Sequence, residues 1–203
     1  MLKDGAAALG VGLGDAELSA FELYLAELVK WNKVTNLTAV DIPGDVVIKH
    51  FLDSIALAPL LPEGPFRAVD VGAGAGFPGL PLKIVRPDME LTLVEPARKK
   101  AAFLKQAARA LGLSGVDVLE EKVEAVAGPC GGGFDVLLSR AFREPAGLLA
   151  VAGALVAPGG AAVLSLGPGA SPAAPVGWRV VAEREITLPF SDYRRRLVRL
   201  AAA

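Results

Sequence analysis

The stretch Asp70-Val71-Gly72-Ala73-Gly74-Ala75-Gly76 lies where a short apolar run, residues 66–71, gives way to a helical pattern. Glycines at a strand-to-helix turn let the backbone turn sharply and come close to a ligand, and the first N–H groups of the helix face that ligand. The stretch therefore predicts a ligand-binding turn at the carboxyl end of a strand.

The spacing of the glycines separates two classes of nucleoside cofactor. A dinucleotide site has the pattern Gly-x-Gly-x-x-Gly, which requires a glycine where this chain has Phe77. The glycines fall instead at Gly72, Gly74 and Gly76, and Asp70 precedes the first by two residues. S-adenosylmethionine has no pyrophosphate but carries a sulfonium cation and a zwitterionic amino-acid end, so a carboxylate beside the turn suits it. The pattern resembles the first motif of S-adenosylmethionine-dependent methyltransferases.

Three further positions follow predicted strands. Glu95 ends the second strand, where an acid can accept hydrogen bonds from both ribose hydroxyls of either cofactor class. Val123 and Glu124 follow the third strand, where such folds contact adenine, although Glu124 is equally explained as an acid at a helix start. Arg140 follows the fourth strand, at the sheet edge where ligands of this architecture bind.

The alternation of short apolar runs and helical patterns from residue 66 onward is typical of a parallel sheet with helices on both faces. The last two runs have no helical segment between them and should pair antiparallel at one edge. The predicted fold class is α/β: a Rossmann-like class I methyltransferase with a mainly parallel seven-stranded sheet, an antiparallel C-terminal edge and an N-terminal helical extension. The predicted strands cover residues 66–71, 90–95, 116–119, 134–139, 161–166, 179–188 and 195–201, and the predicted helices 76–85, 98–111 and 145–154.

The chain before this region is predicted to be helical. One helix is expected from an N-cap at Asp15 to about Asn32, and another over residues 44–58. We therefore divide the chain into an N-terminal helical extension packed on the core, residues 1–62, and a methyltransferase domain, residues 63–203. On the second helix His50 shares a face with Asp53 and Ser54. This face either locks the extension onto the sheet or contacts RNA.

Composition limits the classes of function. With 203 residues and a net charge of −1, the chain is one ordinary domain with an extension, and any nucleic-acid surface must be local. The single Cys130 excludes an internal disulfide framework and, with no signal-peptide pattern, predicts a cytoplasmic protein. The apolar stretch 148–157 is far shorter than the roughly 20 residues that span a bilayer, so no membrane contact is expected. His50 is the only histidine, and no metal is expected.

The residues also narrow the methyl acceptor. The fourth strand lacks the Asn/Asp-Pro-Pro-aromatic motif of enzymes that methylate exocyclic amines, and Cys130 precedes that strand, so it is misplaced as a nucleophile for pyrimidine carbon-5. A ring nitrogen with a free lone pair, such as guanine N7, needs no deprotonation, so positioning and electrostatics can supply most of the catalysis. An arginine pairs well with guanine, which makes Arg140 the candidate catalytic residue.

The chain resembles the bacterial 16S rRNA guanine-N7 methyltransferases of the small subunit, also called the glucose-inhibited division protein B family. The resemblance rests on motifs in the family's order over roughly residues 20–165. They are Trp31-Asn32, Thr35-Asn36-Leu37-Thr38, His50-Phe51-Leu52-Asp53-Ser54, the glycine stretch continued by Phe77-Pro78-Gly79, Arg86-Pro87, Phe103-Leu104, Val123-Glu124 and Ser139-Arg140-Ala141.

The resemblance implies N7 methylation of a guanine in the 530 loop of 16S rRNA, within a small-subunit ribosomal particle. It also implies cofactor contacts at Gly72, Phe77, Val123-Glu124 and Arg140, with Glu95 at the ribose. We expect a monomer. The chain departs from the family at Leu166, where a lysine is common, which leaves a substrate contact in doubt.

Two basic clusters are candidate RNA contacts. Arg98 and Lys99 begin the helix after Glu95, where they form either a solvated face or a phosphate site. Arg194, Arg195 and Arg196 form the densest cluster, on a strand whose alternate side chains share a face. Two alternatives remain open: a methyltransferase for a different RNA, small molecule or protein, and a non-catalytic nucleoside- or RNA-binding module.

Overall fold

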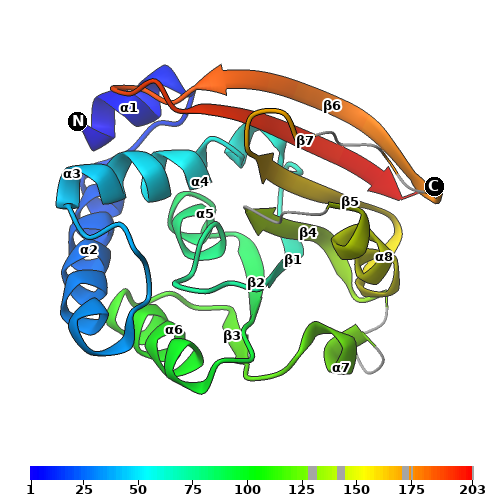
Figure 1. The fold of residues 1–203 in the computed structure, drawn as a ribbon, viewed down its shortest axis with the longest axis horizontal. Coiled ribbons are helices and arrows are strands. Elements are labelled where there is room, and N and C mark those ends of the chain that lie inside the picture. The colour runs from blue at the N-terminus through cyan, green and yellow to red at the C-terminus, as the bar shows by residue number, and fades with distance from the viewer. Residues whose placement is uncertain (128–131, 141–144, 171–173, 175, 203) are drawn as a thin grey trace.

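The computed structural model describes residues 1–127, 132–140, 145–170, 174 and 176–202. Its centre is one seven-stranded sheet in the order β3-β2-β1-β4-β5-β7-β6 (Figure 1). The first five strands are parallel to one another, and β7 is antiparallel to both β5 and β6, so the sheet is mainly parallel with an antiparallel C-terminal edge, as predicted. The strands are β1 (Phe66–Val71), β2 (Met89–Val94), β3 (Val116–Leu119), β4 (Phe134–Arg140), β5 (Val156–Leu166), β6 (Trp178–Thr187) and β7 (Arg194–Ala202).

Helices cover both faces of the sheet, because the central strands are buried on both sides. One apolar core contains Leu80, Leu93 and Phe103 under α5 and α6, and the other contains Leu148 and Leu149 of α8. The helices that follow β1 to β4 are α5 (Gly79–Val85), α6 (Arg98–Ala110), α7 (Val123–Ala127) and α8 (Pro145–Leu155).

The N-terminal extension packs on the α5 and α6 face (Figure 1). Its buried residues Phe21, Tyr24 and Leu28 belong to the same apolar core as Leu80 and Phe103. Its elements are α1 (Leu2–Ala8), α2 (Asp15–Thr35), α3 (Pro43–Val46), a π-helical segment (Val47–Leu52), α4 (Asp53–Ile55) and a 3₁₀ turn (Ala58–Leu60). The last four elements form nearly the helix predicted over residues 44–58.

Helix boundaries differ from the predictions for local reasons. α1 was not predicted, because its Ala/Gly-rich sequence has little pattern; its Gly5 has no side chain, and a Cβ there would come within 2.6 Å of Leu52. The N-cap of α2 is Gly14, whose N–H donates to Glu17, so Asp15 is the first helical residue and not the cap. α5 begins at Gly79, three residues later than predicted.

Strand β5 begins at Val156, five residues before the predicted start. Gly159 and Gly160 in this segment suggest a loop from sequence, but they occupy an irregular part of the sheet beside β4. A Cβ at Gly160 would lie 2.8 Å from the carbonyl oxygen of Asp135. The glycine therefore permits a close approach of two paired strands at a bulge.

None of the helices in the described parts of the chain combines the length and the apolar character needed to cross a membrane. The same residues contain no group of three or more His, Cys, Asp or Glu side chains that could hold a metal ion.

Candidate functional site

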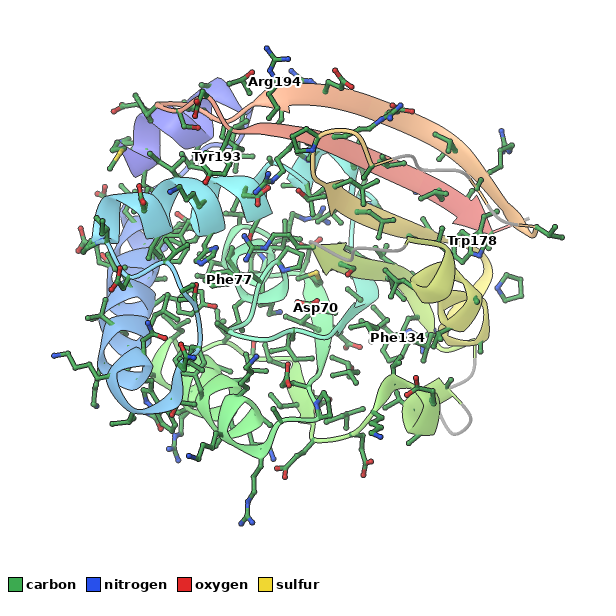
Figure 2. The ribbon with its side chains drawn as sticks, in the orientation of Figure 1. Asp70, Phe77, Phe134, Trp178, Tyr193 and Arg194 are labelled. Atoms are coloured by element: carbon green, nitrogen blue, oxygen red, sulfur yellow. The ribbon has the colours of Figure 1, made fainter. Side chains whose placement is uncertain are left out.

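The turn between β1 and α5 forms the floor of the site, and Figure 2 shows Asp70 and Phe77 in the interior of the molecule. Asp70 is buried, and its Oδ2 accepts a hydrogen bond of 2.9 Å from the N–H of Gly79. Its Oδ1 has no hydrogen-bond partner among the described residues. Burial raises the pKa of this carboxyl to about 7, although the bond from Gly79 acts in the opposite direction. A buried oxygen without a donor is costly, so this place suits a cationic ligand group.

The three glycines of the turn all have positive φ angles, of 70°, 59° and 92° at Gly72, Gly74 and Gly76. Position 76 has a second requirement. A Cβ there would lie 2.6 Å from both the Tyr24 hydroxyl and Leu80 Cδ1. Gly76 therefore serves both the turn and the close packing of α2 against it.

Glu95 joins the turn after β1 to the turn after β2. Its buried carboxylate accepts hydrogen bonds of 2.9 Å from the N–H of Gly74 and from the N–H of Ala97. Each carboxylate oxygen has a further lone pair, so the group can accept additional bonds from a ligand.

A small hollow of about 170 Å³ lies above the glycine turn. The turn forms one wall of the hollow, and the extension, together with the end of β4, forms the other. Its lining residues are Leu37, Thr38, His50, Gly72, Ala73, Gly74, Ala75, Phe77 and Arg140.

A larger hollow of about 460 Å³ adjoins it at the carboxyl ends of β4 and β5. The two hollows share His50 and Arg140, so these two side chains stand between them. The larger one is lined by Val40, Lys49, His50, Asp53, Arg140, Ser165, Gly167, Ala170, Tyr193 and Arg195.

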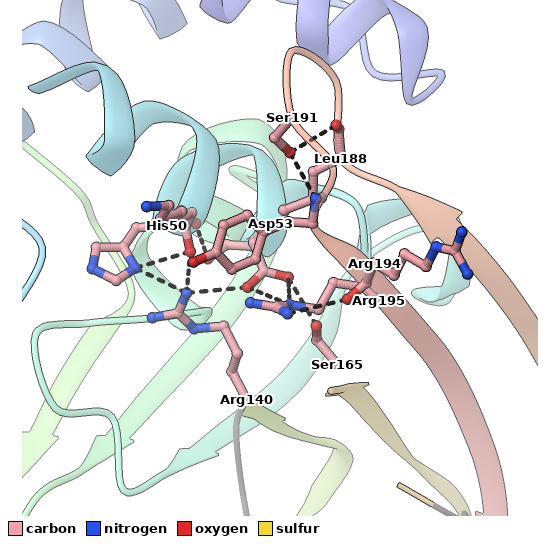
Figure 3. Close-up of polar contacts among 11 residues, drawn as sticks. His50, Asp53, Arg140, Ser165, Leu188, Ser191, Arg194 and Arg195 are labelled. Carbon is pink, nitrogen blue, oxygen red and sulfur yellow. Dashed lines mark hydrogen bonds and ion pairs between the residues drawn. The ribbon is translucent and has the colours of Figure 1, made fainter. Parts of the chain in front are cut away.

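Asp53 is the centre of a polar cluster in this larger hollow (Figure 3). Its carboxylate is fully buried and accepts from Arg195 Nε at 3.0 Å, Arg140 Nη1 at 3.2 Å and Ser165 Oγ at 2.9 Å. A buried carboxylate needs this many partners to offset its desolvation. Its charge and hydrogen-bonding capacity are therefore used within the protein, whereas the guanidinium groups of Arg140 and Arg195 each have N–H groups beyond those bonded to Asp53.

Arg140 is held from several sides. Its Nη1 donates to the carbonyl oxygen of Lys49 at 2.6 Å and lies 3.0 Å from His50 Nδ1, and its Cζ lies 5.0 Å from the centre of the Phe77 ring. Burial lowers the pKa of His50 to about 4, so the ring is neutral at pH 7. His50 Nδ1 also lies 3.0 Å from the Lys49 carbonyl oxygen, and Nε2 shares a hydrogen bond of 2.8 Å with Thr38 Oγ1. The His50 ring also stacks on Phe77, with centroids 4.5 Å apart.

His50 therefore has the contacts of a lock between the extension and the sheet, one of its two predicted roles, and only 8% of its surface is exposed. Ser54, on the same helix face, donates to the His50 carbonyl and takes no part in the cluster around Asp53.

Several predicted residues do not line either hollow. Asp70, Gly76 and Glu95 lie behind or beside the glycine turn and are not lining residues. Glu124 is exposed in the first turn of α7 beside the half-buried Val123, and Arg98 and Lys99 are exposed at the start of α6. Cys130 and Ala141 lie outside the described residues.

The arginine cluster of β7 borders two hollows. Arg194, Arg195 and Arg196 all line a third hollow of about 390 Å³ beside Pro168 and Gly169, and Arg195 also lines the larger hollow, where it bonds to Asp53. Arg196 also pairs with Glu183 of β6.

Sequence reasoning missed several side chains that build this region, among them Ser165, which donates to Asp53. Tyr24 and Asn32 bond to the walls of the small hollow, and Tyr193 lines the larger one with Lys49 Nζ 5.0 Å from its ring centre. The signal was present only for Asn32, which belongs to a motif of the family resemblance. Tyr24 follows the apolar stripe of its helix and has the pattern of an ordinary core residue.

The sequence matches a family and many relatives. The model of the family described as GidB, rRNA small subunit methyltransferase G, matches residues 17–170. A protein named ribosomal RNA small subunit methyltransferase G from Xanthomonas campestris pv. campestris (strain 8004) is 43% identical over 96% of this chain and 94% of its own. A protein of the same name from Myxococcus xanthus (strain DK1622) is 42% identical over 97% of this chain and 93% of its own.

Solved structures share the fold at lower identity. A SAM-dependent methyltransferase from Aquifex aeolicus has a TM-score of 0.61 and 16% identity, over 82% of this chain and 97% of that one. TrmN from Thermus thermophilus has a TM-score of 0.60 and 22% identity, over 75% of this chain and 49% of that one. These likenesses agree with the predicted Rossmann-like methyltransferase fold.

Proposed function

Because this chain belongs to the rRNA small subunit methyltransferase G family and is an S-adenosylmethionine-dependent methyltransferase, we propose that its acceptor is N7 of a guanine in the 530 loop of 16S rRNA. The relatives' name supports an rRNA acceptor. We further propose that the substrate is a small-subunit particle and that the enzyme acts as a monomer. The observation that carries the choice of guanine is the set of hydrogen-bond donors around the larger hollow.

We place the amino-acid end of the cofactor in the small hollow, next to the buried Asp70 beneath the glycine turn. The unpartnered Oδ1 of Asp70 suits the ammonium group of the amino-acid end, and the glycine turn leaves room where side chains would stand. We assign Asp70, Gly72, Gly74, Gly76, Phe77 and Arg140 to this end of the cofactor. Glu95 is assigned to the ribose, and Val123 and Glu124 to the adenine. When bound, S-adenosylmethionine supplies an electrophilic methyl carbon on its sulfonium.

The larger hollow suits a base that presents acceptors. Asp53 is saturated by Arg140, Arg195 and Ser165, so among the described lining residues no carboxylate remains free to accept from an exocyclic amine. Guanine presents the acceptors O6 and N7 on its Hoogsteen edge, whereas adenine presents the N6 donor there. The arginine N–H groups would therefore favour guanine. They would reject adenine, because two hydrogen-bond donors, the arginine N–H and the adenine N6 amino group, would face each other.

Arg140 is the proposed catalytic residue, through positioning of the base. It lies between the two hollows, and Phe77, His50 and Asp53 fix its guanidinium. Guanine N7 already has a lone pair, so no side chain has to remove a proton before attack. The work of the chain is then to hold the base in line with the methyl group and to exclude water.

Contacts to RNA outside the base are assigned to arginines and lysines at the rim. Arg194, Arg195 and Arg196 on β7 are the main candidates, with Arg98 and Lys99 of α6 on the cofactor side. His50 is a weaker candidate than these, since its ring atoms are engaged by Thr38, Arg140 and Phe77.

The function is tested with small-subunit particles from a strain that lacks the enzyme. With radiolabelled cofactor, the purified protein should introduce one N7-methylguanine in the 530 loop, located by nuclease mapping and mass spectrometry. Arg140→Ala should reduce turnover by about 100-fold or more. Because the change also removes a partner of the buried Asp53, it should lower the melting temperature, so turnover is compared at a temperature at which the variant is fully folded. The assignment would be refuted if the radiolabelled methyl group appeared at another nucleotide, in a small molecule or in a protein.

A further inference from the structure

Helix α2 of the extension touches both walls of the small hollow. Figure 1 shows it beside α5 and α6, on the face of the molecule where the glycine turn lies. The two contacts come from Tyr24 and Asn32, which are eight residues apart and lie on the stripe that also contains the buried Leu28. Eight residues correspond to about 12 Å along a helix, so one rigid element reaches two separate segments.

Asn32 fixes the segment that closes the hollow from the extension side. Its Oδ1 accepts from the N–H of Leu37 at 2.7 Å and from the N–H of Thr38 at 3.0 Å, and its Nδ2 donates to the Thr38 carbonyl at 3.0 Å. Asn36, with φ of 31°, ends the helix in the left-handed region and turns the chain back. A single side chain thus holds the two residues that line the hollow opposite the glycine turn.

Tyr24 fixes the glycine turn itself. Its hydroxyl donates to the carbonyl oxygen of Ala75 at 2.5 Å, and the whole residue is buried. The ring packs against Phe51 and Phe77, with centroids 5.4 and 5.5 Å away. Burial raises the pKa of Tyr24 well above its usual value, so the hydroxyl stays a donor.

We infer that α2 is a positioning element of the cofactor site: Tyr24 fixes the glycine turn, Asn32 fixes the Leu37–Thr38 segment, and the helix between them sets the width of the hollow. Neither residue lines the hollow itself. The inference rests on the proposed binding of S-adenosylmethionine above the glycine turn. It assigns to the extension a part in binding the amino-acid end of that cofactor.

The test compares three variants by calorimetric titration with S-adenosylmethionine and by steady-state kinetics. Asn32→Leu removes all three bonds and should raise Kd and the cofactor KM about tenfold. Asn32→Asp keeps an acceptor for both N–H groups and should stay within about threefold of wild type. Tyr24→Phe keeps the ring packing, loses only the bond to Ala75 and should raise Kd about fivefold, while kcat at saturating cofactor changes less than twofold.

Trp31→Phe is the matched control. Trp31 lies on the same helix and packs edge-on against Phe103, at 5.8 Å between centroids, but it bonds to neither wall of the hollow. It should lower the melting temperature while leaving Kd unchanged. If Asn32→Leu does not fold, the pair of Tyr24→Phe and Trp31→Phe decides the question.

Two failures are distinguishable. If wild type binds the cofactor and methylates particles, but Tyr24→Phe and Asn32→Leu bind it equally well, the role of α2 is wrong and the proposed function stands. The same holds if these variants lose kcat with an unchanged cofactor KM. If folded wild type shows no saturable binding of S-adenosylmethionine, the proposed function and the inference both fall.

Discussion

At the scale of single residues, Asp53 determines where the guanidinium groups of the larger hollow lie. Arg140 comes from the end of β4 and Arg195 from β7, and both reach the same buried carboxylate. Two guanidinium groups that contact the same carboxylate are close enough to repel each other, and the negative charge between them offsets that repulsion. The carboxylate therefore keeps both groups at the rim of the hollow, with N–H groups left over for a ligand.

Asp70 gives a pH dependence at the same scale. Because its pKa is about 7 in the free protein, it is mostly neutral at pH 6 and mostly ionised at pH 7.5. Only the carboxylate attracts the cofactor's ammonium group, which stays largely protonated over this range. The affinity for S-adenosylmethionine should therefore increase several-fold from pH 6 to pH 7.5, measured by calorimetry.

The matched variant is Asp70→Asn, which keeps the size of the side chain and cannot ionise. It should bind more weakly at pH 7.5, with an affinity that is flat over the same range. A wild-type profile without slope would contradict the role of Asp70, and so would a slope that survives in Asp70→Asn.

At the scale of elements, strand β7 distributes its charges by the alternation of a strand. The guanidinium of Arg195 reaches the buried Asp53 of α4, whereas Arg194 and Arg196 do not line the larger hollow; all three border the hollow beside residues 168 and 169. In the proposed complex, the base enters the larger hollow and RNA phosphates contact Arg194 and Arg196.

Charge reversal tests this division. The double variant Arg194→Glu with Arg196→Glu should weaken binding to small-subunit particles by tenfold or more, on the order of what two lost phosphate contacts cost at moderate salt. The dependence of log K on log salt should become less steep, and cofactor affinity should not change. Arg67→Glu, at the amino end of β1 and paired only with Asp135 on the surface, is the control. If the double variant and Arg67→Glu weakened particle binding equally, the effect would come from net charge and the proposed phosphate contacts of Arg194 and Arg196 would be wrong.

The elements that sequence predicts well are those with a strong local pattern. β1 and β3 have the predicted bounds, and the antiparallel pair β6–β7 follows from the missing helix between them. The bulged start of β5 could not be predicted, because Gly159 and Gly160 have the local signature of a turn and only pairing with β4 makes them a strand. α1 depends in the same way on tertiary contacts, here on the fit of Gly5 against Leu52.

The site was predictable where it depends on the chain's own turn. The glycine stretch, Glu95 and Arg140 can be located from sequence because strand ends and spacing locate them. The hydrogen bond between Asp53 and Arg195 could not be predicted, since 142 residues separate them and no periodicity relates them. Tyr24 was missed because it lies on the apolar stripe of its helix, so its sequence pattern is that of a core residue and gives no sign that its hydroxyl bonds to Ala75.

At the scale of the whole molecule, the extension and the sheet share one apolar core. Phe21 and Tyr24 of α2 lie in the same buried cluster as Leu80 and Phe103. The boundary that we propose at residue 62 therefore separates two segments of sequence that bury their apolar surface against each other. Such parts tend to unfold together.

The two tryptophans test this cooperativity. Trp178→Phe leaves Trp31 in the extension as the only tryptophan, and Trp31→Phe leaves Trp178 on β6. In each variant, urea unfolding followed by fluorescence should coincide with the transition followed by circular dichroism. A fluorescence transition of Trp31 at clearly lower urea than the circular dichroism transition would mean that the extension unfolds independently.

Arg140 and His50 belong to the lining of both adjoining hollows. In the proposed arrangement, the methyl donor lies in the small hollow and the nucleotide in the larger one, so a shift of these two side chains when the donor binds also changes the contacts of the nucleotide. Thermodynamic linkage then requires equal effects in both directions. The factor by which the bound donor changes the affinity for the nucleotide equals the factor by which the bound nucleotide changes the affinity for the donor. The shared partition thus makes the two equilibria a single linked system.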